Sequence, residues 1–302
     1  MIINDFSERA LRTVLNSDGI CFRAGRFSVN LSANIPRIAK ELLNLYGESE
    51  VLSGPCDFNV QLQRTAGLRY IIKPQVQFIF NGVQPFSPLP LDQAYPLLEW
   101  GLNWCVTNHC HQYLIIHAAV VEKNGFALIL PGQPGSGKST LCAALVERGG
   151  WRLLSDELTM LQLDDQLVVP NPRPVSLKNQ SINLVKSITS SEKFSPVVKD
   201  TIKGSVAHLR PPQSSVKQYD ICAKPVLVVY PKFVKGVDSY IQELSKGQSF
   251  IRLADHCFNY SILGLDGFRA MSGLHDQVTC YDYCYDGNLD EALPLMDSLL
   301  PT

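Results

Sequence analysis

The sequence lacks long apolar runs and lacks an excess of charge of either sign. No stretch approaches 18 uninterrupted apolar residues, so we expect no transmembrane helix. Lys and Arg number 27 against 28 Asp and Glu, and this net charge of −1 gives no sign of nucleic acid or an acidic membrane as partner. The first residues, MIINDFSERALRTV, lack the apolar centre of a secretory signal. We therefore expect a cytoplasmic protein that binds neither nucleic acid nor membrane.

Cysteine is scattered rather than arranged in a framework. The nine cysteines have uneven spacings, so we expect reduced thiols. Segment 105–111 contains two cysteines and two histidines, but no second pair at zinc-site spacing follows, so no zinc site is expected. Cys280 and Cys284 lie in an alternating segment and are expected in the core.

The chain is long enough for about two domains at roughly 150 residues each. Runs 58–63 and 76–80 alternate apolar with polar residues, which predicts two half-buried strands. Apolar residues at helical spacing predict a helix over about 91–110. We place a domain boundary near residue 112, between a smaller α+β domain (1–112) and an α/β domain (113–302).

The second domain begins with apolar runs 114–121 and 126–130. Asn124-Gly125 between them predicts a β-hairpin. A glycine-rich loop follows, then a helix over 138–148 that ends at Gly149-Gly150. Segments 151–155 and 226–230 are predicted strands, and about 246–275 and 288–300 are predicted helices.

Residues 132–139 match the phosphate-binding pattern G-x-x-x-x-G-K-[ST] without a mismatch. The glycines allow backbone angles that turn successive N–H groups around a phosphate. Lys138 would bring a cation to the β- and γ-phosphates of ATP, and the Ser139 hydroxyl would join the shell of Mg²⁺. A predicted strand before and a helix after supply the required context. We therefore expect a nucleotide site formed by Gly132, Gln133, Pro134, Gly135, Ser136, Gly137, Lys138, Ser139 and Thr140.

Two adjacent carboxylates, Asp156 and Glu157, follow the predicted strand 151–155 and come 18 and 19 residues after Lys138. Carboxyl ends of parallel strands meet at one sheet edge, so we expect both beside the phosphate loop. A carboxylate there can bind Mg²⁺ together with Ser139, activate water or accept a proton. The spacing is too short for the acidic strand of many motor ATPases and GTPases. An N-K-x-D sequence is also missing where a GTPase would read guanine, so a guanine-specific switch is not expected.

With these elements assembled, the chain resembles HPr kinase/phosphorylase, a P-loop protein serine kinase. The similarity runs through Ile116-His117-Ala118, the hairpin and segments 132–140, 147–149 and 154–157. Segments 98–105, 173–179, 203–212 and 258–261 extend it to the group called HPr kinase-related kinase A, over essentially the whole chain. The resemblance implies a P-loop kinase domain of the HPr kinase type that phosphorylates a hydroxyl with ATP and Mg²⁺.

The resemblance also implies roles for single residues. Asp156 is the base toward the acceptor serine, Glu157 is the second acidic residue, and His117 is the histidine near the active site. The family's later glycine-rich signature, with its metal-binding glutamate, has no match after Glu157, so neither the acceptor nor a reverse phosphorylase reaction is implied. Members of the narrower group are linked to a small peptide-binding partner of the PqqD type.

Several residues allow two interpretations. Arg173, Lys178, Lys203 and Arg210 are expected to line the site and to contact phosphate or an acidic acceptor, with His208 as a further cation, but a solvated surface is the alternative. The apolar run around His117 also fits a buried core histidine. The three tryptophans are expected in the core.

The function that we predict is transfer of the γ-phosphoryl group of ATP to a hydroxyl, with a serine of a protein or peptide as acceptor. A nucleotide-dependent peptide-binding module or switch and a small-molecule kinase remain alternatives, because all three need the same phosphate site. A homo-oligomer is also left open.

Overall fold

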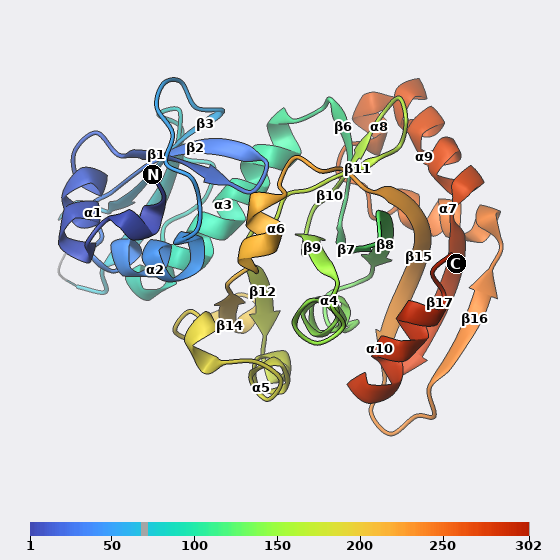
Figure 1. Ribbon diagram of the computed structural model, residues 1–302. Helices are drawn as coiled ribbons and strands as arrows, with labels where there is room; N and C mark the ends of the chain where they lie inside the picture. The colour runs from blue at the N-terminus through green and yellow to red at the C-terminus, as the bar shows by residue number, and fades with distance from the viewer. Residues whose placement is uncertain (68–71, 302) are drawn as a thin grey trace.

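The first part of the chain forms a five-stranded sheet with helices packed against it (Figure 1). In this computed structural model, which describes residues 1–67 and 72–301, the strands follow the order β1 (Ile20–Ala24), β2 (Phe27–Ala33), β3 (Phe58–Arg64), β4 (Gln75–Phe80) and β5 (Leu89–Pro90). The helical segments are η1 (Ile3–Asp5), α1 (Glu8–Leu15), α2 (Arg37–Tyr46), η3 (Leu91–Gln93) and α3 (Ala94–His109). Both alternating runs are strands, and α3 covers most of the predicted 91–110 helix, so these predictions are confirmed.

A six-stranded sheet organises the second part. Its order is β16 (Tyr240–Leu244), β17 (Thr279–Tyr285), β15 (Lys224–Phe233), β8 (Phe126–Pro131), β7 (Ala118–Lys123) and β9 (Arg152–Ser155). β8, β15 and β17 run parallel, whereas β7 is antiparallel to both β8 and β9. β9 therefore points the same way as β8. The sheet is mixed rather than parallel, yet the carboxyl ends of β8 and β9 do share one edge, as expected.

Both faces of this sheet are buried. Ala119 and Val121 of β7 belong to a core with α4 (Lys138–Glu147) and α10 (Leu289–Ser298). Ala118 and Val120, one residue out of phase, belong to the opposite core with α7 (Lys246–Ala254) and α9 (Leu265–Gln277). Because successive side chains of a strand point to opposite faces, the continuous apolar runs of β7 and β8 fit a sheet covered on both sides. Cys280 and Cys284 of β17 are buried, as predicted.

Two three-stranded sheets complete the second part. One has the order β11 (Val168–Val169), β10 (Thr159–Gln162) and β6 (Tyr113–Ile116). The other has the order β12 (Val175–Lys178), β14 (Gly204–Leu209) and β13 (Val198–Thr201). The remaining helical segments are α5 (Gln180–Lys186), η4 (Ser191–Lys193), α6 (Gln213–Lys217) and α8 (Tyr260–Leu263). Segments 172–178 and 203–210, which contain the four cations expected to line the site, thus include strands β12 and β14.

Two segments that the sequence predicts to be continuous are divided in the structure. The run 114–121 forms β6 and β7 in different sheets, because the His117 N–H donates to the His256 carbonyl at 2.7 Å instead of continuing a strand. The predicted helix 246–275 is three helices, α7 to α9. Its last break is at Gly264, where φ is +56°, a conformation that favours glycine.

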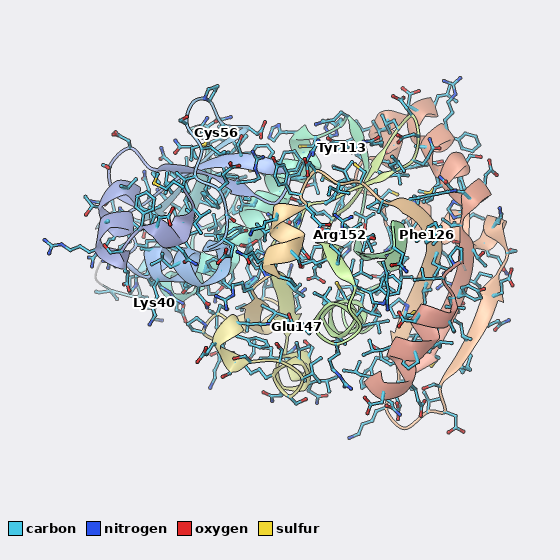
Figure 2. All side chains as sticks on the ribbon, viewed as in Figure 1. Lys40, Cys56, Tyr113, Phe126, Glu147 and Arg152 are labelled. Carbon is cyan, nitrogen blue, oxygen red and sulfur yellow. A yellow bond between two sulfur atoms is a disulfide. The ribbon has the colours of Figure 1, made fainter. Side chains whose placement is uncertain are left out.

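The expectation of reduced cysteines is wrong for one pair. Cys21 on β1 and Cys56 in the loop before β3 form a disulfide with Cα atoms 6.6 Å apart. Of the two, Cys56 is labelled in Figure 2. The two residues are 35 positions apart and meet only when the sheet forms, so their spacing gives no local signal. The other seven cysteines, all within the described residues, are free.

Helix α3 lies between the blue N-terminal elements and the remainder of the chain in Figure 1. The boundary near residue 112 falls just after this helix and stays a prediction. Across the described residues, none of the helices has both the length and the apolar character that crossing a bilayer requires.

Close packing of α3 on the five-stranded sheet generates a stability prediction. A Cβ at Gly101 of α3 would collide with the Phe78 ring of β4. We expect Gly101→Ala to destabilise the protein by about 1–3 kcal/mol, because overpacking outweighs the gain in helix propensity of about 1 kcal/mol. Urea unfolding measures the change.

The matched control is Gly247→Ala in α7, where an added Cβ meets nothing within 4 Å. This variant should unfold at the same urea concentration as the wild type or at a higher one. A Gly101→Ala protein as stable as Gly247→Ala would contradict this packing.

Candidate functional site

The phosphate-binding loop connects β8 to α4. Gly135 and Gly137 have φ of +87° and +93°, the left-handed region in which glycine is favoured. A Cβ at Gly137 would also collide with the Tyr285 hydroxyl of β17, which donates to the Gly137 carbonyl at 3.2 Å. The loop is tied to β15 as well, because the Phe233 N–H donates to the Ser136 carbonyl at 3.0 Å. The first N–H groups of α4 have no partner within the helix and carry its positive dipole, which makes this end an anion site.

Lys138 begins α4 and is buried. Its ammonium donates to the Gly132 carbonyl at 3.0 Å, so the side chain folds back over the loop. Burial lowers the pKa of Lys138, and the carboxylate of Asp156 opposes this shift. Lysine, loop and carboxylate therefore form one electrostatic unit.

Asp156 follows β9 directly and is 5% exposed. Its Oδ2 accepts the Ser176 N–H at 2.9 Å, whereas Oδ1 is buried with no hydrogen-bond partner among the described residues. Burial and the neighbouring Glu157 carboxylate raise the pKa of Asp156 to about 6, against the Ser176 N–H and the Ser139 hydroxyl, which favour the anion. The result is a carboxylate with one free oxygen and a pKa suited to proton transfer near neutrality.

Glu157 lies beside Asp156 in a different environment. Burial would raise its pKa, but the cations led by Lys178 and Lys203 outweigh burial and lower the pKa to about 2. The Lys178 ammonium approaches Oε1 at 3.4 Å, and the Asn103 amide of α3 donates to Oε2. Both oxygens of Glu157 are engaged, so this carboxylate acts as a fixed negative charge.

The four cations predicted to line the site have different partners in the structure. Lys178 and Lys203 influence Glu157 directly, and the Lys203 ammonium lies 5.0 Å from the centre of the Trp100 ring. Arg173 is buried and donates to Asn103. Arg210 donates to the Asn44 carbonyl of α2 at 3.3 Å, so its side chain contacts the N-terminal part.

Neither histidine named from the sequence is a cation. Burial and the Lys138 charge lower the pKa of His117 to about 4, and the ring packs 5.6 Å from Phe258. Burial lowers the pKa of His208 to about 3, and its ring lies edge-on to Tyr95 at 5.1 Å. The expectation of His208 as a further cation is therefore wrong, because a buried imidazole loses the water that would stabilise its charge. His117 is a neutral imidazole beside the phosphate loop.

A small cavity of about 20 Å³ lies behind the acidic pair, and helix α3 supplies part of its wall. That volume is enough for about one water molecule. Six of the lining residues have a buried polar atom that lacks a partner among the described residues; these are Trp100, Asp156, Asn171, Arg173, Ser176 and His208. The core interpretation holds for Trp151, which is buried, and for Trp104, which packs against the N-terminal core, but not for half-buried Trp100, which faces this cavity.

Asn103, Trp100 and Glu99 are site residues that no motif in the sequence indicates. Their only sequence signal is the similarity of segment 98–105 to HPr kinase-related kinase A, which implies no chemical role for them. Asn103 lies 29 positions before Gly132, the first residue of the phosphate loop, so no local pattern connects the two.

The site fits a magnesium ion that is completed by nucleotide. No group of three or more His, Cys, Asp or Glu side chains able to hold a metal occurs within residues 1–67 and 72–301. Mg²⁺ needs fewer protein ligands, since it binds through one or two carboxylates together with phosphate oxygens and water. The free Oδ1 of Asp156 and the nearby Ser139 hydroxyl are suitable ligands, whereas Glu157 has both oxygens occupied.

Comparison with known proteins yields distant similarity to solved structures and none to a family model or a curated protein. Among solved structures, the Hpr(Ser) kinase/phosphatase from Coxiella burnetii is similar at 12% identity and a TM-score of 0.28, over 61% of this chain and 92% of that protein. A similarity at this level carries no argument for fold or function, so the relationship to HPr kinase-related kinase A stays a prediction from the sequence.

The loop geometry predicts that Lys138 is needed for nucleotide binding. Lys138→Ala removes a cation that would contact phosphate, so the affinity for MgATP should fall roughly tenfold to a hundredfold, the worth of a charged hydrogen bond. Isothermal titration calorimetry measures this, with exposed Lys217→Ala of α6 as the charge-matched control. Equal affinity for MgATP in the two variants would contradict the assignment of the phosphate site.

Proposed function

We propose that this protein is an ATP-dependent kinase that transfers the γ-phosphoryl group to a hydroxyl. One observation carries the proposal, namely that Asp156 presents a buried, unpartnered carboxylate oxygen with a raised pKa in the electrostatic unit that contains Lys138 of the phosphate loop. A site that only binds nucleotide needs the loop, but it does not need a carboxylate poised to take a proton.

The residues divide the chemistry between them. The loop N–H groups and Lys138 would hold the β- and γ-phosphates and neutralise the charge that develops during transfer. Ser139 and Asp156 would hold Mg²⁺, which shields the phosphate oxygens when bound. Asp156 would accept the proton of the attacking hydroxyl. Glu157 stays anionic, and its charge adds to the effect of burial in raising the pKa of Asp156.

The proposal also covers the phosphate acceptor and the partners of the protein. A serine of a protein or peptide as acceptor, a PqqD-type peptide-binding partner and a homo-oligomer follow from the sequence resemblance. Lys178 and Lys203, on β12 and in the turn between β13 and β14, would contact the phosphate or an acidic acceptor. Arg173 would act through Asn103, and Arg210 would act only if the acceptor reaches α2.

Asp156→Asn separates the base from the metal ligand. If Asp156 is the base, this variant should bind MgATP like the wild type and transfer phosphate about 10²–10⁴ times more slowly. Calorimetry and ADP formation measure the two quantities. Joint loss of binding and transfer would show that Asp156 acts mainly on the metal ion, and unchanged transfer would exclude both roles.

The raised pKa of Asp156 predicts the pH dependence of kcat. The carboxyl must be ionised to accept a proton, so activity should fall below about pH 6, tenfold per pH unit. Glu157→Gln removes the negative charge that contributes to the raised pKa, so the acidic limb should move to lower pH. An acidic limb at the same pH in both proteins would rule out this electrostatic coupling.

The most informative experiment identifies the acceptor. Purified protein is incubated with ATP labelled on the γ-phosphate and an extract of the source cells, with Lys138→Ala as the control. A labelled macromolecule that depends on Lys138 supports a protein or peptide kinase, and a labelled small solute supports a small-molecule kinase. Slow release of labelled phosphate without a labelled acceptor would instead favour a nucleotide-dependent switch.

A further inference from the structure

Helix α3 reaches the acidic pair through a single side chain. Asn103 donates its amide N–H to Glu157 Oε2, and its carbonyl oxygen accepts from the Arg173 guanidinium. This contact joins the N-terminal part of the chain to the end of β9, where Asp156 is the next residue.

The orientation of the Asn103 amide is determined by its neighbours. Arg173 has only donors, so the amide oxygen must face Arg173 and the amide nitrogen must face Glu157. Arg173 is itself held at 3.9 Å from the carboxylate of Glu99, on the same helix as Asn103. Glu99 also accepts hydrogen bonds from Tyr46 at 2.8 Å and Tyr95 at 2.7 Å. A buried network anchored in the N-terminal part therefore ends as one N–H donor aimed at Glu157.

We propose that Asn103 is a positioning residue for phosphoryl transfer, in that its hydrogen bond holds the Glu157 carboxylate in place beside Asp156. This inference rests on the proposed function and gives the N-terminal part a role in it. Lys178 binds the other oxygen of Glu157 from β12, so the carboxylate is clamped between two elements. Without Asn103, Lys178 would be the one hydrogen-bond donor left to this carboxylate among the described residues, and the carboxylate could turn about that bond.

A purely structural role makes a different prediction. If Asn103 only joined the two parts, its loss would lower stability and reduce nucleotide binding and turnover together. A positioning role reduces kcat and leaves nucleotide affinity unchanged, because none of the contacts proposed for the phosphates involve Asn103. The ratio of the two effects separates these roles.

The test uses the protein with Asn103→Leu, in which the side chain keeps the same branched shape and has no polar atoms. We expect kcat for ADP formation to fall tenfold or more while the affinity for MgATP stays within about twofold, since small displacements in an active site cost up to about 10²-fold in rate. Asn108→Leu is the control, because Asn108 lies on the same helix, is exposed and bonds to the Trp104 carbonyl of its own helix at 2.9 Å. Its kcat should equal that of the wild type.

Asn103→Asp is a second variant that tests the same role if Asn103→Leu does not fold. The aspartate keeps an acceptor for Arg173 but places a negative charge against Glu157. We expect this variant to keep its MgATP affinity within about twofold and to lose kcat, because repulsion between the two carboxylates displaces Glu157 from its position.

The outcomes distinguish the two proposals. Absence of ATP turnover in the wild-type protein would contradict the proposed function, and with it this inference. A wild-type protein that turns over ATP, together with unchanged kcat in Asn103→Leu or an equal loss of binding and turnover, would overturn the positioning role alone.

Discussion

The burial of two adjacent carboxylates at the end of β9 is the constraint on which the site depends. A buried carboxylate costs several kcal/mol unless cations and hydrogen bonds compensate for lost water. Here the compensation comes from separate elements, with Lys178 on β12, Lys203 before β14 and Asn103 on α3 all acting on Glu157. The fold must therefore bring the small sheet β12–β14–β13 and helix α3 to the edge at which β8 ends in the phosphate loop.

The same constraint gives the two carboxylates different properties. Glu157, with both oxygens engaged, has its pKa lowered to about 2, whereas Asp156, with one oxygen free, has its pKa raised to about 6. Neighbouring acids whose environments push their pKa values apart are a common arrangement for dividing a fixed charge from a base. The cavity of unpartnered polar atoms behind Asp156 shows that polarity continues beneath the site, where an ordered water would satisfy several groups at once.

Local signals explain which parts of the structure the sequence could predict. The phosphate loop, the hairpin before it and the acidic residues after β9 depend on neighbours in the chain, and the structure has this hairpin, α4 and β9 where the patterns indicate. Asn103 and Trp100 contact residues more than 50 positions further along the chain. Tryptophan is also a typical core residue, so its type alone does not indicate a site. His117 lies in an unbroken apolar run, and its N–H donates to the His256 carbonyl, a partner far along the chain that no local pattern indicates. The disulfide between Cys21 and Cys56 is another long-range contact without a local pattern.

The most direct test is a crystal structure of the full chain with Mg²⁺ and a non-hydrolysable ATP analogue. The account predicts the phosphates against the backbone N–H groups of residues 135–139, the metal at about 2.1 Å from the Ser139 hydroxyl oxygen, and Asn103 still bonded to Glu157. A nucleotide bound elsewhere, or phosphates in this loop with Asp156 turned away from them, would contradict it.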